Sequence, residues 1–416
     1  MPGMSAVKET IRRPLETALK VFLASLPPPP IRLDQIQRIL VFAYHGLGNF
    51  VMFTPALKLL RERYPAARID LQVGNNTGCD EVLAGAGIFD NIYNLPYSAG
   101  LSRWARRAFE IRQARYDLTI NEFHSHSWPI ALLTAFSGAP FRLGHVTSPG
   151  WSHRFSRYSF VFNIPIEMRE NEHEIDRYLD LIAAVSGPLD YRQASTFIHL
   201  TGADGEFAER FLGGDAVSRS AVTIGMQPGT SPTMRWKQWP LARYREIIQK
   251  LLAHHPDARI VLFGSASERP MICDLARDLG SNVIIAAGKT TVKQAAALIQ
   301  RCQMLVCNDS GLMHLAVAVG TPVVAIYGPT DIRRTAPIGS EHTVIRHDLA
   351  CSPCFKLEGD GRVHLCQHHD CLMTITSEEV LEAINEKLID RTPWAGATRT
   401  KLNGLEGTSR MKQSAN

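Results

Sequence analysis

Residues 308–331 read NDSGLMHLAVAVGTPVVAIYGPTD, and this stretch decides the fold. A polar Asp-Ser-Gly turn leads into an apolar helix, and the apolar strand PVVAIYG follows. Strands that are buried on both faces of a parallel sheet have this near-continuous apolar character. A helix between two such strands is the crossover that parallel pairing requires. The stretch therefore predicts an α/β fold.

The same alternation of strands and helices occurs in both halves of the chain. Strand patterns are RILVFAY, ARIDLQVG and YDLTINEF in the first half, and AVTIGMQPG, ARIVLFGS, SNVIIAAG and QMLVCND in the second. They predict two parallel sheets with helices on both faces. One helix runs through TPALKLLRERYP, with Pro55 expected in its first turn. Between residues 140 and 200 the pattern is weak, until HEIDRYLDLIAAVSG predicts a closing helix.

Length, composition and charge exclude several classes of protein. The chain has 416 residues, 45% of them hydrophobic, so two domains with cores are expected. A net charge of +5 fits contact with anionic substrates or an acidic membrane surface, whereas 40 acidic residues argue against a dedicated nucleic-acid-binding protein. No apolar run reaches the roughly 18 residues of a membrane span, and the N-terminus lacks a secretory core. We therefore expect a cytoplasmic protein with reduced cysteines.

Polar residues follow the strands of the second half, where parallel sheets bind ligands. The loop after AVTIGMQ offers backbone N–H groups, the hydroxyls of Thr230 and Ser231, and the cations of Arg235 and Lys237. These groups suit a phosphate or pyrophosphate. An ordinary charged surface loop is the alternative. Glu268, after the next strand, either accepts hydrogen bonds from ribose hydroxyls or merely suits the N-terminus of the following helix.

The turn at residues 309–311 also has two interpretations. Asp309 or Ser310 caps the helix, or the helix N-terminus lies at an anion site. A carboxylate beside phosphates is a poor phosphate ligand but a good acceptor for sugar hydroxyls. A sugar joined to a diphosphate satisfies both features.

These blocks carry a family resemblance. In the second half, QPGT…RWKQWP, LFGSASE and the stretch quoted at the start resemble the heptosyltransferase family, glycosyltransferase family 9. The first half resembles it through ILVFAYHGLGNFVMFTPALKLLRERYPAARIDLQVG and HEIDRYL, so the likeness covers residues 37–390. The resemblance implies a GT-B fold, meaning two Rossmann-like domains that face each other across a cleft. It also implies inverting transfer of a heptose from an ADP-sugar to lipopolysaccharide core, with no cofactor required for catalysis.

The resemblance further implies the donor-binding residues and the domains. The diphosphate would be bound by Thr230, Ser231 and Lys237, the ribose by Glu268, and the donor sugar by Asp309, with Ser310 and Gly311 at the helix start. The expected segments are an amphipathic helix with a proline-rich spacer (1–36), an acceptor-binding domain (37–200), a linker (201–219), a nucleotide-sugar-binding domain with a Cys-rich loop at 351–371 (220–392) and a disordered tail (393–416).

Asn49 departs from the family pattern. Its turn reads GLGN, whereas family members resemble GxGD, with the aspartate taken as the general base. An amide has no useful basicity, so Asn49 can only orient an acceptor hydroxyl. Another base is then expected, either His45 on the same turn or Glu122, His124 or His126 after YDLTIN. Alternatively, the transfer needs no base, because positioning of the substrates and departure of the nucleotide diphosphate are enough to drive it.

Two other classes of function stay open on the sequence. The chain could bind nucleotide sugars without transferring them, because of Asn49. It could also be a GT-B-like sugar-nucleotide epimerase, although the sequence does not place the acid and base residues that this reaction needs.

Four cysteines form one cluster in the sequence. They read C-x2-C, eleven residues, then C-x4-C, at Cys351, Cys354, Cys366 and Cys371. This spacing suits structural zinc, while an iron–sulfur cluster, buried reduced thiols or disulfides are the alternatives.

The expected partners are a nucleotide-sugar donor and a lipid-linked or core-oligosaccharide acceptor, with no nucleic acid. The basic amphipathic helix at residues 5–26 either lies on a membrane or packs on the protein body. The arginines Arg103, Arg106, Arg107 and Arg112 could face acceptor phosphate or anionic lipid. We therefore expect peripheral contact with the cytoplasmic face of the inner membrane.

Overall fold

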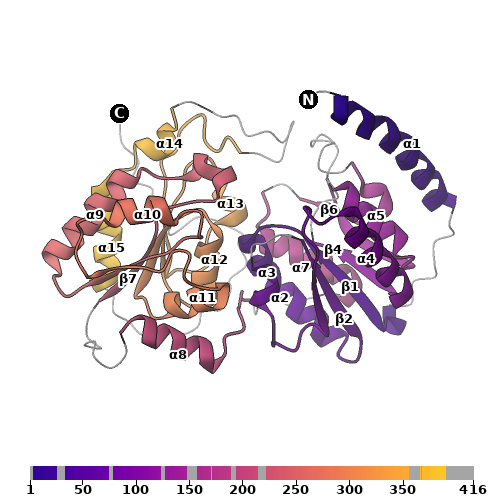
Figure 1. Cartoon of the computed structure of the whole chain (residues 1–416), viewed down its shortest axis with the longest axis horizontal. Helices are drawn as coiled ribbons and strands as arrows, with labels where there is room; N and C mark the ends of the chain where they lie inside the picture. Colours follow the sequence, from indigo (N-terminus) through magenta and orange to yellow (C-terminus); the bar gives the residue numbers. More distant parts are fainter. Residues whose placement is uncertain are drawn as a thin grey trace.

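Two parallel sheets form the two halves of the molecule, and they stand side by side (Figure 1). The computed structural model describes residues 3–25, 33–74, 78–122, 127–147, 157–169, 171–188, 194–213, 222–355, 366 and 368–389. Each sheet has six strands, and helices cover both of its faces. The predicted α/β class, with two Rossmann-like sheets in a GT-B arrangement, is confirmed.

The two sheets share one topology. The first has the order β3-β2-β1-β4-β5-β6, and its strands are β1 (Arg38–Ala43), β2 (Arg68–Val73), β3 (Asn91–Asn94), β4 (Leu118–Asn121), β5 (Phe141–Thr147) and β6 (Ile164–Met168). The second has the order β12-β11-β10-β7-β8-β9, and its strands are β7 (Thr223–Gln227), β8 (Arg259–Leu262), β9 (Val283–Ile285), β10 (Met304–Asn308), β11 (Val323–Ile326) and β12 (Thr343–Ile345). In both sheets the winding reverses beside the first strand. These switch points, β1/β4 and β7/β10, are where open parallel sheets bind ligands.

Helices connect the strands. Those of the first half are α1 (Gly3–Ser25), α2 (Leu47–Arg63), α3 (Cys79–Val82), α4 (Leu101–Ala114), α5 (Trp128–Phe136) and α7 (Glu174–Ser186), with the short 3-10 turns η1 (Leu33–Gln35) and η2 (Ser159–Val161). Those of the second half are α8 (Gly202–Phe211), η5 (Pro232–Lys237), α9 (Leu241–His254), α10 (Arg269–Ala276), α11 (Val292–Gln300), α12 (Gly311–Ala318), α13 (Ile332–Thr335), α14 (Asp370–Met373) and α15 (Ser377–Ile389).

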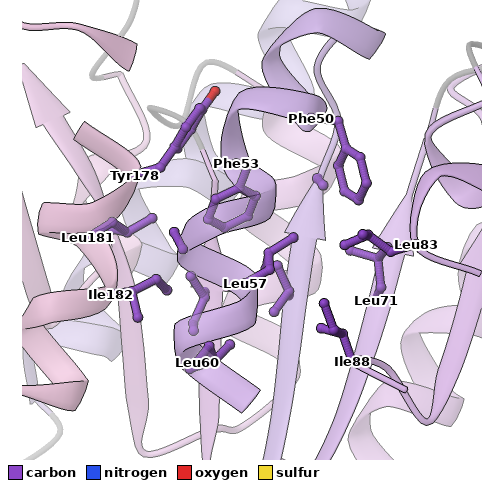
Figure 2. Close-up of a cluster of buried hydrophobic side chains, with 14 of the residues drawn as sticks. Phe50, Phe53, Leu57, Leu60, Leu71, Leu83, Ile88, Tyr178, Leu181 and Ile182 are labelled. Atoms are coloured by element: carbon purple, nitrogen blue, oxygen red, sulfur yellow. The ribbon is translucent and has the colours of Figure 1, made fainter. Parts of the chain in front are cut away.

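Helix α2 is the centre of the first core. Its apolar side chains, among them Phe50, Phe53 and Leu57, pack between strand β2 and helix α7 (Figure 2). On α7, Tyr178 and Leu181 face them. Because the helix is buried on both sides, its position relative to the sheet is held firmly, and so is the turn from which it starts.

The expectation for Pro55 is wrong, because α2 begins at Leu47 and not near the proline. Pro55 therefore lies inside the helix and cannot donate a hydrogen bond to the carbonyl of Val51. The hydroxyl of Thr54 donates to that carbonyl instead, at 2.7 Å. This substitute bond satisfies the freed acceptor, so the helix continues through the proline.

The two halves are in direct contact at the edge where their strands end. Helix α12 packs on α2, and α11 packs on α3 (Figure 1). Leu315 of α12 and Ala296 of α11 belong to the same buried cluster as the core of the first sheet. The loops at both switch points therefore meet at this junction.

Two flanking segments pack on the body of the protein. Helix α8, in the segment expected to be a linker, packs on α11 and buries Ala208. Helix α1 places Leu19 and Leu23 against Tyr158 and Trp128, which lie beside η2 and in α5. The tail at 393–416 lies outside the described residues.

Candidate functional site

Asn308 organises the switch point of the second sheet. It is the last residue of β10, and its Oδ1 accepts a hydrogen bond from the backbone N–H of Trp239 at 2.9 Å. Its amide nitrogen donates to the carbonyls of Pro228 and Gly229, both at 3.2 Å. One buried side chain thus ties the loop after β7 to the end of β10, which places the two loops side by side.

Lys237 and Asp309 form an ion pair at this point. The Nζ of Lys237 lies 2.7 Å from Oδ2 of Asp309. The side chains are 17% and 7% exposed, so the pair is shielded but reaches solvent. Burial alone would raise the pKa of Asp309, but the Lys237 ammonium outweighs burial and holds this pKa below its usual value. Asp309 is therefore a carboxylate at neutral pH.

The other predicted diphosphate residues have different degrees of exposure. Thr230 is buried, and its hydroxyl donates to the carbonyl of Met234 at 3.1 Å. Ser231 and Arg235 are exposed on the same loop. Ser310 precedes Gly311, the first residue of α12, and its hydroxyl donates to the Gln227 side chain. The structure brings Thr230, Lys237, Asp309 and Ser310 together around the start of α12.

Glu268 presents a buried oxygen to the same edge. Its Oε2 accepts hydrogen bonds from the backbone N–H and the hydroxyl of Ser265, at 2.7 and 2.6 Å. Its Oε1 is buried, and none of the described residues donates a hydrogen bond to it. A Cβ added at Gly229 would lie 2.2 Å from Oε1, so the glycine allows the carboxylate to approach the phosphate loop. A carboxylate that is fixed through one oxygen, and whose other oxygen lacks a donor among the described residues, is a suitable acceptor for a ribose hydroxyl.

The turn at Gly48 meets this site from the first half. A Cβ added at Gly48 would lie 2.7 Å from Cδ2 of His314 and 3.3 Å from Cα of Gly311. Asn49 follows directly and lies in the first turn of α2. His314 is buried, and burial lowers its pKa to about 4, so it is neutral at physiological pH. The predicted acceptor turn therefore contacts the start of the predicted donor helix.

His45 and Glu122 lie at the switch point of the first sheet. The Nδ1 of His45 is 3.2 Å from Oε1 of Glu122. The backbone N–H of Glu122 donates to the carbonyl of Phe42 at 3.0 Å, which fixes the two strand ends against each other. His124 and His126 lie outside the described residues.

Glu174 joins the two halves, and the sequence did not predict this role. It accepts hydrogen bonds from Arg177 of its own helix and from Arg334 of α13. Its neighbour His173 lies with Nε2 3.0 Å from the carbonyl of Ala336. Burial alone would raise the pKa of Glu174, but Arg334 and then Arg177 lower it to about 2. The only sequence signal was the polar start of an otherwise apolar helix, HEID.

The four clustered cysteines are free thiols. Burial raises the pKa of Cys371 to about 11, and the nearby Cys354, Cys366 and Cys351 add to this effect. Within the described residues, however, no three Cys, His, Asp or Glu side chains are arranged to hold one metal ion. Residues 356–365 of this loop lie outside the described residues, so the structural zinc site stays a prediction from the spacing.

The sequence profile of glycosyltransferase family 9 (heptosyltransferase) matches residues 104–360, which is more than half of the chain. The chain belongs to glycosyltransferase family 9. It is therefore a glycosyltransferase, as the sequence predicted.

Relatives in this family match over nearly their full length. The lipooligosaccharide heptosyltransferase 2 of Haemophilus influenzae is 28% identical, over 84% of this chain and 99% of the relative. The lipopolysaccharide heptosyltransferase 2 of Escherichia coli K12 is 28% identical, over 85% of this chain and 99% of the relative. The solved structure of the E. coli ADP-heptose lipopolysaccharide heptosyltransferase II superposes with a TM-score of 0.66 at 25% identity, covering 85% of this chain and 99% of that chain. About a sixth of this chain thus lies outside each match.

Proposed function

We propose that this family 9 enzyme is an inverting heptosyltransferase that moves heptose from ADP-heptose to a lipopolysaccharide-core saccharide. The observation that carries the proposal is the Lys237–Asp309 pair at the β7/β10 switch point, where Asp309 lies two residues before Gly311, which packs on Gly48 in the first turn of α2. The named relatives, which are lipopolysaccharide and lipooligosaccharide heptosyltransferases, support it. They favour transfer over binding alone and over epimerisation.

Different residues of the site bind different parts of the donor. Lys237 and the N–H groups at the start of α12 offer positive charge to the diphosphate, and Glu268 offers an acceptor to the ribose. Asp309 accepts hydrogen bonds from sugar hydroxyls. In the reaction, the acceptor oxygen bonds to the anomeric carbon while the bond from that carbon to the diphosphate breaks, and ADP leaves with the electron pair. Because Lys237 supplies the charge that stabilises the departing phosphate, we propose that the transfer is metal-independent.

An arginine pocket in the first half supports an anionic acceptor. It lies at the carboxyl ends of β2 and β3, and Arg103, Arg106 and Arg107 line it. The guanidinium of Arg107 is held by Gln72, whose Oε1 lies 2.6 Å from Nε, and it stacks 3.6 Å from the ring centre of Tyr93. Its buried Nη2 lacks a hydrogen-bond partner among the described residues. A carboxylate or phosphate of the acceptor would supply one.

Peripheral contact with anionic lipid, at the cytoplasmic face of the inner membrane, is a further part of the proposal. Leu15, Val21 and Phe22 of α1 are 56%, 66% and 58% exposed, and Leu101 of α4 is 88% exposed. Basic residues lie among them, with Lys20 on α1. Exposed apolar side chains flanked by cations favour a surface of anionic lipid. Of the helices in the described residues, none is both long and apolar enough to cross a membrane.

The test is a transfer assay with purified protein, ADP-heptose and a heptose-deficient core acceptor. Mass spectrometry of the acceptor should show one added heptose per ADP released, and UDP- or GDP-hexoses should give at least tenfold less product. ADP-heptose binding without any product would contradict the proposal.

Variants in the same experiment test the donor assignment. Lys237→Ala removes a charged phosphate contact worth about 1.5–3 kcal/mol, so the Kd for ADP should rise at least tenfold. Lys250→Ala is the matched control, because Lys250 is a partly exposed lysine on α9 whose ion-pair partners in the described part of the chain are Glu246 and Glu378. Equal affinities of the two variants would overturn the phosphate assignment.

A further inference from the structure

The proposed transfer needs a base, and Asn49 cannot serve as one. As the acceptor oxygen attacks the anomeric carbon, its proton must go to a basic group. The Asn49 amide lacks such basicity, and His314 across the junction is buried. At the first switch point, His45 and Glu122 form a pair at the ends of β1 and β4, with the carbonyl of His45 3.8 Å from the Cys79 thiol.

The two side chains differ in their exposure to solvent. A base must be reachable by the substrate, whereas a residue that only positions the base can be buried. The carboxylate of Glu122 is 1% exposed, whereas the imidazole of His45 is 17% exposed, so the ring is the member that solvent and substrate can reach. Glu122 is held by its backbone bond to Phe42 and by β4, whose residues Leu118–Asn121 are all buried. A fixed carboxylate beside Nδ1 sets the direction of the ring and the position of its proton.

The environment of Glu122 defines its role further. Its second oxygen, Oε2, is buried, and no described residue gives it a hydrogen bond. Burial raises the pKa of Glu122, while the hydrogen bond from His45 and the charge of this ring oppose that rise. The other titratable groups facing it are Glu174, Tyr178 and Tyr97, and the backbone carbonyl of Glu122 contacts His145. When His45 takes up a proton, its positive charge therefore lies next to the buried carboxylate of Glu122 and compensates the negative charge of that group.

The pair lies beside the donor site. Gly48, three residues after His45, packs against Gly311 and His314, and Gly311 follows Asp309 by two residues. The sugar assigned to Asp309 is thus adjacent to the turn that carries His45. Each switch point contributes one pair of ionisable side chains to the junction.

We propose that His45 is the general base of the transfer and that Glu122 is its positioning residue. Nε2 of His45 takes the proton of the acceptor hydroxyl as the new bond to the anomeric carbon forms and ADP leaves. Nδ1 keeps its proton toward Glu122, whose charge stabilises the imidazolium until the proton passes to solvent. This assignment rests on the proposed function.

The test compares His45→Gln, Glu122→Gln and the control His255→Gln in the transfer assay across pH. His255 is an exposed residue at the end of α9. His45→Gln should lower kcat by about 10²-fold or more while the Kd for ADP-heptose stays within about threefold of wild type. The wild-type kcat should rise with pH through one ionisation, and this inflection should be absent in His45→Gln. In Glu122→Gln the inflection should move to lower pH, because the imidazolium loses its counter-charge.

Several outcomes would overturn the assignment. They are a His45→Gln variant with kcat within threefold of wild type, an unchanged pH inflection in that variant, and an inflection that does not move in Glu122→Gln. If His45→Gln does not fold, judged by circular dichroism, His45→Asn takes its place with the same expectations. A wild-type protein that binds ADP-heptose without turnover would overturn the proposed function itself, which separates the two failures.

Discussion

Gly48 shows how one residue can connect the two halves. It lies in the first turn of α2, where a glycine is not needed for the backbone and alanine would favour the helix. The reason for the glycine is space, because a Cβ would lie 2.7 Å from the buried ring of His314 and 3.3 Å from the backbone of Gly311. The missing side chain lets the acceptor turn and the donor helix touch.

Gly48→Ala should therefore lower both stability and turnover. Overpacking at a rigid junction costs about 1–3 kcal/mol in the free energy of unfolding, and the displaced turn should lower kcat/KM at least tenfold. Gly46→Ala is the matched control, because nothing lies within 4 Å of a Cβ at Gly46 and its φ is −70°. Urea unfolding and the transfer assay measure both effects. Equal losses in the two variants would show that the close contact does not matter.

At the level of elements, the sequence predicted β2 and β4 although they carry buried polar residues, among them Asp70 and Asn121, but it did not predict β5. Strand β5, FRLGHVT, contains Arg142 and His145, which are buried and bonded to the backbone. Arg142 donates to the carbonyl of Val161 at 2.7 Å, and Nε2 of His145 lies 3.1 Å from the carbonyl of Arg177. These partners come from distant parts of the chain, so local periodicity could not reveal the strand.

The candidate site could be predicted only in part, because some of its contacts depend on elements that are distant in the sequence. Asp309 directly follows β10 and Lys237 lies in the loop after β7, and the topology rule places such residues at one edge. The pairing of His45 with Glu122, in contrast, depends on β4 lying next to β1, which the sequence alone does not specify. The Glu174–Arg334 contact depends on the orientation of the two halves, and the polar start of α7, HEID, did not indicate the partner from the other half.

Helix α1 carries a prediction of its own. The double variant Val21→Glu, Phe22→Glu replaces two exposed apolar side chains with charges, so binding to vesicles that contain phosphatidylglycerol should fall at least tenfold. Ile389→Glu is the control, because Ile389 is 82% exposed at the end of α15 in the other half. Co-sedimentation measures the bound fraction. A double variant that sediments like wild type would contradict membrane contact through α1.

For the whole molecule, the buried Glu174 is a charged link between the halves, because it accepts hydrogen bonds from Arg177 of α7 and Arg334 of α13. Its side chain is 2% exposed, and its single negative charge lies against the guanidinium groups of Arg177 and Arg334. Removing the charge takes this counter-charge away from the buried Arg177 and the partly buried Arg334, and breaking a buried ion pair typically costs about 3–5 kcal/mol. The link therefore holds the relative orientation of the two sheets as well as the stability of α7.

Glu174→Gln should lower the free energy of unfolding at pH 7 by about 3–5 kcal/mol. The folded pKa of Glu174, about 2, lies below the ordinary value of 4.5, so its contribution is complete above pH 4.5 and is lost as pH falls toward 2. The difference between wild type and variant should shrink over that range in urea titrations. Glu62→Gln, at an exposed pair with Lys58, should cost less than about 1 kcal/mol at every pH. A constant difference between pH 7 and pH 3 would contradict the assignment.

A crystal structure of the protein with bound ADP-heptose would show whether the donor occupies the β7/β10 switch point. We expect the diphosphate within hydrogen-bonding distance of Lys237 Nζ, the ribose at Glu268, and the heptose at Asp309 with its anomeric carbon facing the turn of His45 and Asn49. A donor bound away from the β7/β10 switch point, or a heptose that points away from the first half, would contradict this placement.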